Sequence, residues 1–522
     1  MERRWKLLTL LSFTVLAIGV SLWLGRVWLS GPEKASVATK SVDDYWAETG
    51  LSPDSLRDVV DDDTCQSSRR YFLACANALV TVAGRMGYEI SLQGELKPLS
   101  EKSNDQTEIT QLETWKKSYS ENPQALKVVR FGSLWKQLME MPIQQGKRAT
   151  LTGAGLNAFL SVFRDPHTYI LPLDYYQNVI SNPQASSTVL GVVLARSEQG
   201  YFLRKVIEGS PAASSGLQRG DWVLSVNEVV LKDYPPQRLG DLLRGAEGKS
   251  TEIEVLRGGK NLKISVQRSN VKIPSVAWKP LEGDRPVGVL TLHKFAQGSC
   301  MDMKKALTEM NGKKLQGLLL DLRDNSGGQM DEAACMVSLF VGPDKAAFRI
   351  RYLDPSRDPE THFGSEAQLW NGRIAVLVNS GTASAAEILA GSLRDHKRAL
   401  LVGERTFGKG SFQEGEIWKR NGRIAFFQTK GFYYLPSGYS PQLKGVAPDV
   451  KVSFRKSLAL REEDQYLNPL LSPSRVEEPP TRTVDLSICA SSAGVTDDPQ
   501  LNQAQTALFC EPVAGGGPRA AL

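Results

Sequence analysis

The sequence predicts a fold of the α+β or α/β class, made of several units along 522 residues. Residues 315–328 and 374–395 each run from a short apolar strand into a turn of small residues, which a helix follows in the second stretch. Residues 189–267 instead hold short strands separated by glycine turns, as in a small β-rich unit. At about 150 residues per domain, the chain has room for roughly three or four domains.

Residues 1–28 predict a membrane anchor. Basic residues precede an apolar run from Leu7 to Gly25, whose 19 residues lie between the length of a signal-peptide core and that of a membrane span. The small-residue pattern Ser36-Val37-Ala38 lies far from this run, which disfavours cleavage. We therefore expect an uncleaved signal anchor that crosses the cell inner membrane once, with the remaining chain on the periplasmic side. The alternative is secretion to the periplasm after signal cleavage.

The composition of the chain restricts the cellular compartment and the classes of partner that we expect. The net charge of +6 comes from 63 basic and 57 acidic residues spread along the chain, so we expect no nucleic-acid role. Six cysteines, an even number, indicate disulfides in an oxidising compartment, and no C-x-x-C spacing suggests zinc. We expect Cys489 to pair with Cys510, and we expect no cofactor and no metal. A Cys65–Cys75 pair stays open, because one continuous helix over 68–83 would hold the two cysteines too far apart.

Residues 29–125 predict a tether, up to about Thr49, followed by a helical N-terminal region. Ser52-Pro53 has the composition of a helix start, and residues 71–82 carry apolar side chains at helical spacing. We attach no chemistry to this region.

Residues 188–270 form the β-rich unit, with a hairpin expected around Gly258-Gly259. The run G-S-P-A-A-S-S-G-L-Q-R-G-D-W-V-L-S-V-N, which starts at residue 209, resembles that of bacterial PDZ domains. The resemblance implies a module that adds an extended peptide to a sheet edge and holds its terminal carboxylate in backbone N–H groups. The peptide-binding residues expected from it are Leu190, Gly191, Val192 and Val193. The alternative is an interaction domain without a preference for tails.

Residues 374–413 carry the expected reaction centre. A strand, a sharp turn and a helix from about Ser384 leave backbone N–H groups unpaired beside the serine, which suits a nucleophile. Ser384 and Glu387 also have capping-box spacing, so the serine could simply cap its helix. Lys409 lies between two glycines, where no neighbouring Cβ crowds its amine, and Gln413 follows four residues later on the same face.

The segments T-A-S-A-A-E-I-L-A-G-S-L and A-L-L-V-G-E-R-T-F-G-K-G-S-F-Q resemble the active-site pair of the C-terminal processing (tail-specific) peptidases, which are Ser-Lys serine proteases. The resemblance implies that Ser384 is the nucleophile, Lys409 the general base and Gln413 the residue that orients the lysine. The run D-L-R-D-N-S-G-G resembles the family's D-L-R-x-N-x-G-G, which implies an oxyanion hole made by the backbone N–H groups of Gly328 and Ala385. The family more often has S-A-S-A-S where this chain has T-A-S-A-A, and the nucleophile position is unchanged.

Ordered motifs of this family cover residues 125–465. They imply a mixed-sheet protease core in two parts, 126–187 and 271–455, with the PDZ domain inserted between them. D-P-H-T-Y, from Asp165, resembles the family's D-P-H-[ST]-x-Y-[LI]. We interpret His167 as a structural histidine beside Asp165, since Lys409 supplies the base.

The expected function is that of a serine endopeptidase, a C-terminal processing protease, that recognises the C-terminal tails of proteins or peptides. Its expected partners are proteins with exposed, unstructured, apolar C termini, the membrane through the anchor, and as a further candidate an adaptor protein. The oligomeric state does not follow from the sequence. The rivals are a catalytically inert PDZ scaffold and a Ser-His hydrolase that uses His167, His293, His362 or His396. Residues 456–522 are expected to be a polar, weakly structured C-terminal extension.

Overall fold

The structure is a computed structural model of the chain. It describes residues 40, 42–99, 107–143, 147–180, 187–197, 199–232, 239, 242–243, 247–271, 274–282, 285–453, 461–465, 469–471, 476–482, 484, 486, 489, 496 and 498–510. The predicted anchor, residues 1–28, lies outside these residues and stays a prediction. None of the described helices combines the length and the apolar composition that a membrane crossing requires.

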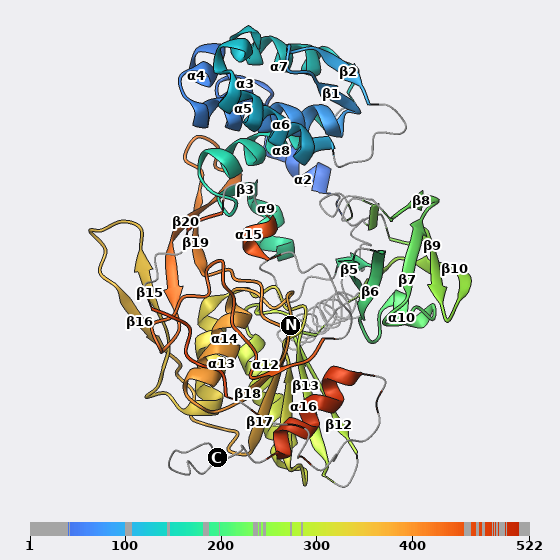
Figure 1. Cartoon of the computed structure of the whole chain (residues 1–522), viewed down its shortest axis with the longest axis vertical. Coiled ribbons are helices and arrows are strands. Elements are labelled where there is room, and N and C mark those ends of the chain that lie inside the picture. Colours follow the sequence, from blue (N-terminus) through green and yellow to red (C-terminus); the bar gives the residue numbers. More distant parts are fainter. Residues whose placement is uncertain are drawn as a thin grey trace, which may run out of the picture. The chain divides into compact units, whose positions relative to one another are not determined.

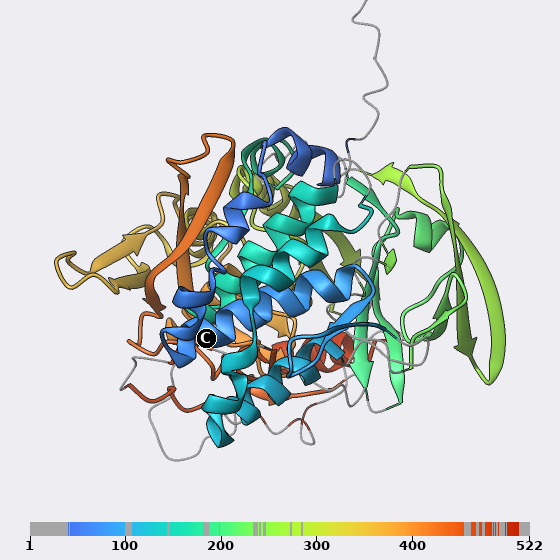
Figure 2. The same cartoon turned by 90° about the horizontal axis from the view of Figure 1, so that it is seen from above.

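The N-terminal region is helical, as predicted, and packs around helices α5 and α8 (Figures 1 and 2). Buried aromatic side chains fill the space between the helices, among them Phe72, Trp115 and Phe131. The elements are α2 (Val42–Glu48), α3 (Asp54–Arg57), α4 (Asp62–Gln66), α5 (Arg69–Arg85), β1 (Tyr88–Ile90), β2 (Leu96–Pro98), α6 (Thr107–Glu121), η1 (Pro123–Val128), α7 (Phe131–Glu140) and α8 (Lys147–Phe163).

One expectation for this region was wrong, and the pairing that was left open for Cys65 and Cys75 is present. Residues 42–48 are helix α2 and not tether, because Trp46 is buried against α8. Cys65 and Cys75 form a disulfide, with their Cα atoms 6.0 Å apart. The continuous helix α5 does exist, but Cys65 lies on the separate short helix α4, which the turn at Ser67 folds back against α5.

A mixed sheet forms the centre of the core (Figure 1). Its strand order is β12-β13-β14-β17-β18-β21, with β12 antiparallel to β13 and the other neighbours parallel. The strands are β12 (Val276–Leu281), β13 (Val287–Leu292), β14 (Gly317–Asp321), β17 (Arg373–Val378), β18 (Leu400–Gly403) and β21 (Val450–Lys451).

Both faces of this sheet are covered, as the continuous apolar runs in its strands require. Leu318 and Leu320 on β14 pack with helices α12 (Ser299–Asn311), α13 (Met330–Val341) and α14 (Ala385–Asp395). Leu319, between them, points to the other face and packs with Leu508 of α16 (Pro499–Phe509). Because β13, β14, β17 and β18 run parallel, the turns after β14 and β17 meet at one edge of the sheet.

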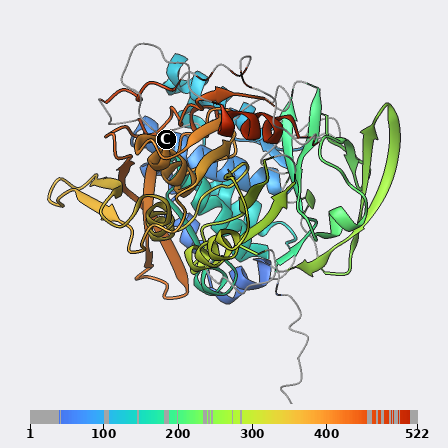
Figure 3. The same cartoon turned by 90° about the horizontal axis from the view of Figure 1, so that it is seen from below.

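The last of these helices corrects the expectation of a weakly structured extension. Figure 3 shows α16, in red, alongside the strands of the core sheet. Its residues Ala504, Ala507 and Leu508 are buried. The predicted disulfide Cys489–Cys510 joins the C-terminal end of this helix to the segment before it. Asp498, whose side chain accepts the N–H groups of Gln500 and Leu501, caps the helix, followed by a proline in its first turn. This start signal was present in the sequence.

A second sheet carries further strands of the core, in the order β16-β15-β20-β19, with β3 also paired to β20. All its pairs are antiparallel. The elements are β3 (Tyr169–Pro172), β15 (Ala346–Tyr352), β16 (Glu360–Phe363), β19 (Ser411–Ile417) and β20 (Ile424–Tyr434), and the short helices α9 (Leu173–Tyr175), η2 (Tyr176–Ile180) and α15 (Glu462–Gln465) complete the core. The pairing of β3 with β20 joins the two parts of the core that the β-rich unit separates in the sequence.

The β-rich unit has the strand order β10-β9-β7-β6-β5, so β5 is an edge strand. β4 (Ser187–Val189) pairs with β11 (Ser269–Val271) where the chain enters and leaves the unit. The other elements are β5 (Val192–Ser197), β6 (Gly200–Val206), α10 (Pro211–Ser214), β7 (Trp222–Val226), β8 (Val229–Val230), β9 (Ser250–Arg257) and β10 (Lys260–Gln267). The predicted hairpin is present, and Gly258 and Gly259 both have positive φ.

Replacing Gly153 tests the packing of α2 on α8. A Cβ at Gly153 would lie 2.6, 2.7 and 2.9 Å from three ring atoms of Trp46, so Gly153→Ala must displace a buried indole. We expect the free energy of unfolding to fall by about 1–3 kcal/mol, measured by urea unfolding followed by circular dichroism. Gly422→Ala is the matched control, because its Cβ would meet no atom within 4 Å. Equal stability of the two variants would contradict this packing.

Candidate functional site

Ser384 lies in the turn between β17 and α14, where the sequence placed it. Its backbone has φ 57° and ψ −121°, whereas an ordinary helix cap is extended. A non-glycine residue with positive φ is strained, and such residues cluster at functional sites. This conformation sets Ser384 apart from a serine that only begins a helix.

The capping alternative is nonetheless partly correct. Ser384 and Glu387 form a capping box, in which the Glu387 carboxylate accepts the N–H of Ser384 at 2.9 Å. The Ser384 hydroxyl lies near the backbone N–H of Glu387, but it does not form a capping hydrogen bond. The carboxylate therefore holds the turn, and the hydroxyl is available for chemistry.

Glu387 also holds the lysine loop. Its Oε2 accepts the N–H of Lys409 at 2.9 Å in addition to that of Ser384, and its Oε1 accepts the Thr406 hydroxyl at 2.5 Å and the Gly408 N–H at 2.9 Å. The side chain is 0% exposed, and this burial raises the pKa of Glu387 to about 7, although all four donors favour the charged form. One carboxylate thus fixes the backbones of Ser384 and Lys409 within about two hydrogen-bond lengths of each other.

Tyr433, on β20, contacts the same two residues, Ser384 and Lys409, through their backbone carbonyl groups. Its hydroxyl lies 2.8 Å from the carbonyl oxygen of Lys409 and 3.3 Å from that of Ser384. Tyr433 is buried, and burial raises the pKa of its hydroxyl well above the usual value, so it stays a donor. Sequence reasoning missed both Tyr433 and the bridging role of Glu387.

The Lys409 amine faces the residue that was expected to orient it. Its Nζ donates to Gln413 Oε1 at 2.8 Å. Burial lowers the pKa of Lys409, and the charges of Glu462, Glu387 and Asp165 act in the opposite direction. Among the described residues, no hydrogen bond joins this amine to the Ser384 hydroxyl. Glu387 brings the backbones of the two residues together, and catalytic contacts often tighten only when substrate binds.

The Gly327-Gly328 turn after β14 lies against the serine. A Cβ at Gly327 would be 2.8 Å from the Cβ of Ser384 and 2.9 Å from the N of Ala385. The N–H of Gly327 is engaged, since it donates to Asn325 Oδ1 at 2.9 Å. Within the described part of the chain, the N–H groups of Gly328 and Ala385 have no acceptor. The expected oxyanion hole, made by Gly328 and Ala385, stays a prediction and needs this pair of unengaged donors.

Phe295 supports this turn from behind. Its N–H donates to the Gly327 carbonyl at 3.2 Å, and its carbonyl accepts the N–H of Gln329 at 2.8 Å. A Cβ at Gly328 would lie 2.3 Å from the Phe295 oxygen, so only glycine fits there.

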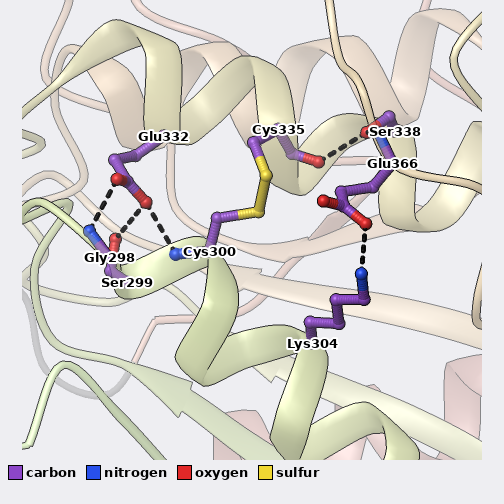
Figure 4. Close-up of a disulfide and its surroundings, with 8 residues drawn as sticks. All are labelled: Gly298, Ser299, Cys300, Lys304, Glu332, Cys335, Ser338 and Glu366. Carbon is purple, nitrogen blue, oxygen red and sulfur yellow. Dashed lines mark hydrogen bonds and ion pairs between the residues drawn. A yellow bond between two sulfur atoms is a disulfide. The ribbon is translucent and has the colours of Figure 1, made fainter.

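A disulfide between Cys300 and Cys335, which was not predicted, fastens the helices on either side of the turn (Figure 4). Cys300 lies at the start of α12, just after Phe295, and Cys335 lies in α13, just after the glycines. Beside it, Glu332 accepts the N–H groups of Gly298 and Cys300, each at 2.7 Å. The sequence signal was only the even number of cysteines.

His167 lies in the loop before β3, and its backbone N–H donates a hydrogen bond to Asp165 Oδ1 at 3.0 Å. Its ring Nε2 lies 2.6 Å from Oε1 of Glu462, a buried residue of α15 in the C-terminal extension. The other histidines are spread over the structure: His362 stacks on Phe348, His396 bonds the Ala346 carbonyl, and burial lowers the pKa of His293 to about 4. No hydrogen bond in the described residues joins any of the four to Ser384.

The expected peptide-binding residues lie at the start of the edge strand β5. Gly191 has φ 86°, and a Cβ there would lie 2.1 Å from the Cβ of Ser210. Leu190 and Gly191 are anchored by their carbonyl oxygens, which accept the N–H groups of Ala212 and Ile207, each at 2.8 Å. Val192 and Val193 begin β5, whose outer edge has no neighbouring strand among the described ones. These residues are where a strand-adding peptide would need them.

The β-rich unit also contacts the serine loops directly. Arg204 on β6 pairs with Asp324 at 2.5 Å and donates to the Ser380 hydroxyl at 3.3 Å. Asp324 precedes the Gly327-Gly328 turn, and Ser380 precedes Ser384. No sequence pattern marked Arg204.

Comparison with known proteins gives matches for both units. Residues 286–452 match the profile described as Peptidase family S41, and residues 202–257 match that of a PDZ domain. Relatives from Staphylococcus haemolyticus and Staphylococcus aureus, both named "Probable CtpA-like serine protease", are 26% identical over 303 and 313 residues, which are 58% and 59% of this chain. The alignments span only 60% and 62% of those relatives. The solved photosystem II D1 C-terminal processing protease is 26% identical, with a TM-score of 0.44 over 66% of this chain and 92% of that one.

Glu387→Gln tests the buried carboxylate through the pH dependence of stability. The pKa of Glu387 is about 7 in the folded chain and 4.5 without the fold, so its contribution is complete below pH 4.5 and is lost as the pH rises through 7. Relative to the variant, we expect the wild type to lose roughly 3 kcal/mol of unfolding free energy between about pH 5 and pH 9. Urea unfolding of both proteins at the two pH values measures this difference, and parallel pH curves would contradict it.

Proposed function

Since this chain belongs to peptidase family S41 through residues 286–452 and carries a PDZ domain over residues 202–257, we propose that it is a serine endopeptidase of the C-terminal processing type. The family resemblance noted in the sequence is thereby confirmed. The single observation that carries the proposal is that one buried carboxylate, Glu387, holds both Ser384 and Lys409 by their backbone N–H groups.

In the proposed reaction, neutral Lys409 removes the proton of Ser384 as the serine oxygen attacks a peptide carbonyl. The backbone N–H groups of Gly328 and Ala385 stabilise the oxyanion, where loss of one donor typically costs about 10²- to 10³-fold in rate. Protonated Lys409 then gives its proton to the leaving amine, and water hydrolyses the acyl-enzyme. Gln413 suits the role of orienting Lys409, because its side-chain carbonyl accepts from the amine. It adds no negative charge that would raise the pKa of Lys409.

The proposed substrates are proteins with exposed, unstructured, apolar C termini, bound along β5 with the terminal carboxylate at residues 190–193. An adaptor protein that delivers them is a further proposed partner. We place the protein at the cell inner membrane, with its catalytic part in the periplasm. The apolar run after the basic N-terminal residues and the three disulfides among the described cysteines support this location.

A Ser-His hydrolase is the second candidate, because His167 and Glu462 form a buried pair of the kind that orients a catalytic histidine. The proposal of a lysine base is favoured because the backbones of Lys409 and Ser384 share two bridging groups. Substitution of Lys409 and of His167 distinguishes these two candidate functions.

Ser384→Ala and Lys409→Ala are each expected to reduce turnover of an unstructured substrate by about 10³-fold or more. Mass spectrometry of the cleaved tail measures turnover, and a fluorophosphonate probe reports the reactive serine. His293→Ala, His362→Ala, His396→Ala and His167→Gln should keep turnover. Loss of activity in His167→Gln with activity kept in Lys409→Ala would favour the Ser-His hydrolase. An inert scaffold would show neither labelling nor cleavage in the wild type.

Gly191→Ala tests tail recognition. The new Cβ would collide with Ser210, so the loop that presents the N–H groups must shift. We expect KM for a substrate with a free apolar C terminus to rise about tenfold or more, while kcat stays near that of the wild type. The same substrate with an amidated C terminus is the control, because the wild type should already bind it weakly. An equal KM for the two tails in the wild type would contradict carboxylate recognition.

A further inference from the structure

Behind the Lys409–Gln413 contact, a chain of hydrogen bonds leads away from the reaction centre. Gln413 Nε2 donates to the Thr429 hydroxyl at 3.2 Å, and that hydroxyl donates to Asp165 Oδ1 at 2.7 Å. The chain starts in β19, crosses to the neighbouring strand β20 and ends in the loop before β3. It therefore joins both parts of the core, which the PDZ domain separates in the sequence.

The protons in this chain can be arranged in one way. A carboxylate only accepts, so the single proton of the Thr429 hydroxyl goes to Asp165. The hydroxyl then has only lone pairs for Gln413, and the end of the Gln413 amide that faces it must be the NH₂ group. The carbonyl end of the amide consequently faces Lys409 and accepts from its amine.

Asp165 is itself held firmly. It is 6% exposed, its Oδ1 accepts the backbone N–H of His167 at 3.0 Å, and its Oδ2 accepts the Thr168 hydroxyl at 2.6 Å. Thr168 in turn accepts the N–H of Thr429 at 3.4 Å. Together with the Thr429 hydroxyl, these groups give the Asp165 carboxylate three donors.

The orientation of the Gln413 amide matters for the chemistry. When the Gln413 carbonyl accepts one N–H of the neutral amine, the lone pair of Lys409 is left to take the Ser384 proton. A reversed amide would present NH₂ to the amine, so it would compete with Ser384 for that lone pair. Thr429 and Asp165 touch neither substrate nor the reacting atoms. Thr429 acts through Gln413, and Asp165 acts through Thr429 and through its charge on Lys409.

We propose that Asp165 and Thr429 are positioning residues that set the Gln413 amide so that Lys409 can act as the base. This deepens the proposed function and rests on it. It also gives the D-P-H-T segment a role different from the Ser-His pairing considered for it.

Kinetics of a double-mutant cycle test the proposal. Thr429→Val is expected to lower kcat by about 10- to 100-fold with KM for a tail peptide unchanged, because only the orientation of the base is lost. Thr429→Ser, which keeps the hydroxyl, should restore kcat to within about threefold. In a Gln413→Ala background, Thr429→Val should cause no further loss, since Thr429 has no other route to Lys409. Thr308→Val, the same change on the exposed side of α12, is the matched control and should leave kcat unaltered.

The pH profile separates the position of Asp165 from its charge. Titratable groups face Lys409 from several elements: Glu387 on α14, Glu462 on α15, Tyr433 on β20 and Asp165 itself. Asp165→Asn keeps an oxygen for Thr429 but removes a charge that raises the pKa of Lys409, so the acid limb of kcat/KM should move to lower pH. At a pH above the acid limb, Asp165→Ala should also lose kcat, and this loss should vanish in the Gln413→Ala background.

Each outcome decides one of the two proposals. If Ser384→Ala and Lys409→Ala abolish turnover but Thr429→Val has wild-type kcat, the positioning proposal is overturned while the proposed function stands. Additive losses in the double variants would also overturn it, because they indicate a merely structural role. If Ser384→Ala or Lys409→Ala keeps turnover, the proposed function itself fails. Should Thr429→Val not fold, as judged by its melting temperature, Thr429→Ala provides the same comparison.

Discussion

The site depends on a carboxylate without solvent contact. Glu387 has four donors, which come from the serine turn and from the lysine loop, so both segments must adopt their positions together. A buried carboxylate that lost one of these donors would carry the desolvation cost with less compensation. The pKa of Glu387 is raised because the effect of burial is larger than the opposite effect of the four donors. The strained backbone of Ser384 is held in place by this balance and by the Tyr433 hydroxyl.

Sequence reasoning worked where a local pattern has a local cause. The strand–turn–helix pattern around Ser384 follows from an apolar run, small residues and a change of period, and the structure has β17 and α14 there. The mixed core sheet, the PDZ domain and the helical N-terminal region were correct at this level. The wrong expectations at Trp46 and in α16 share a cause. Both segments are ordered by the surface against which they pack.

Most of the support around the reaction centre could not be predicted. Thr429 and Tyr433 lie on β20, and only the antiparallel pairing with β19 brings Thr429 beside Gln413. Asp165 is in a recognisable motif, but its partner lies 264 residues away. Such contacts depend on strand register across the chain, and register is a tertiary property that single residues do not encode. The candidate catalytic residues could be proposed from the sequence because their chemistry restricts the residue types, and their roles stay a prediction.

The pairing of His167 with Glu462 has a consequence for the order in which the molecule is made. A ribosome that has just added residue 455 has already produced Ser384, Lys409 and Gln413, yet the buried carboxylate that contacts the His167 ring does not exist. At that point Gln442 also lacks both acceptors of its side-chain amide, Glu462 Oε1 and the Leu470 carbonyl. The nascent chain therefore carries all three candidate catalytic residues before these contacts can form, because Glu462 and Leu470 lie beyond the matched family region.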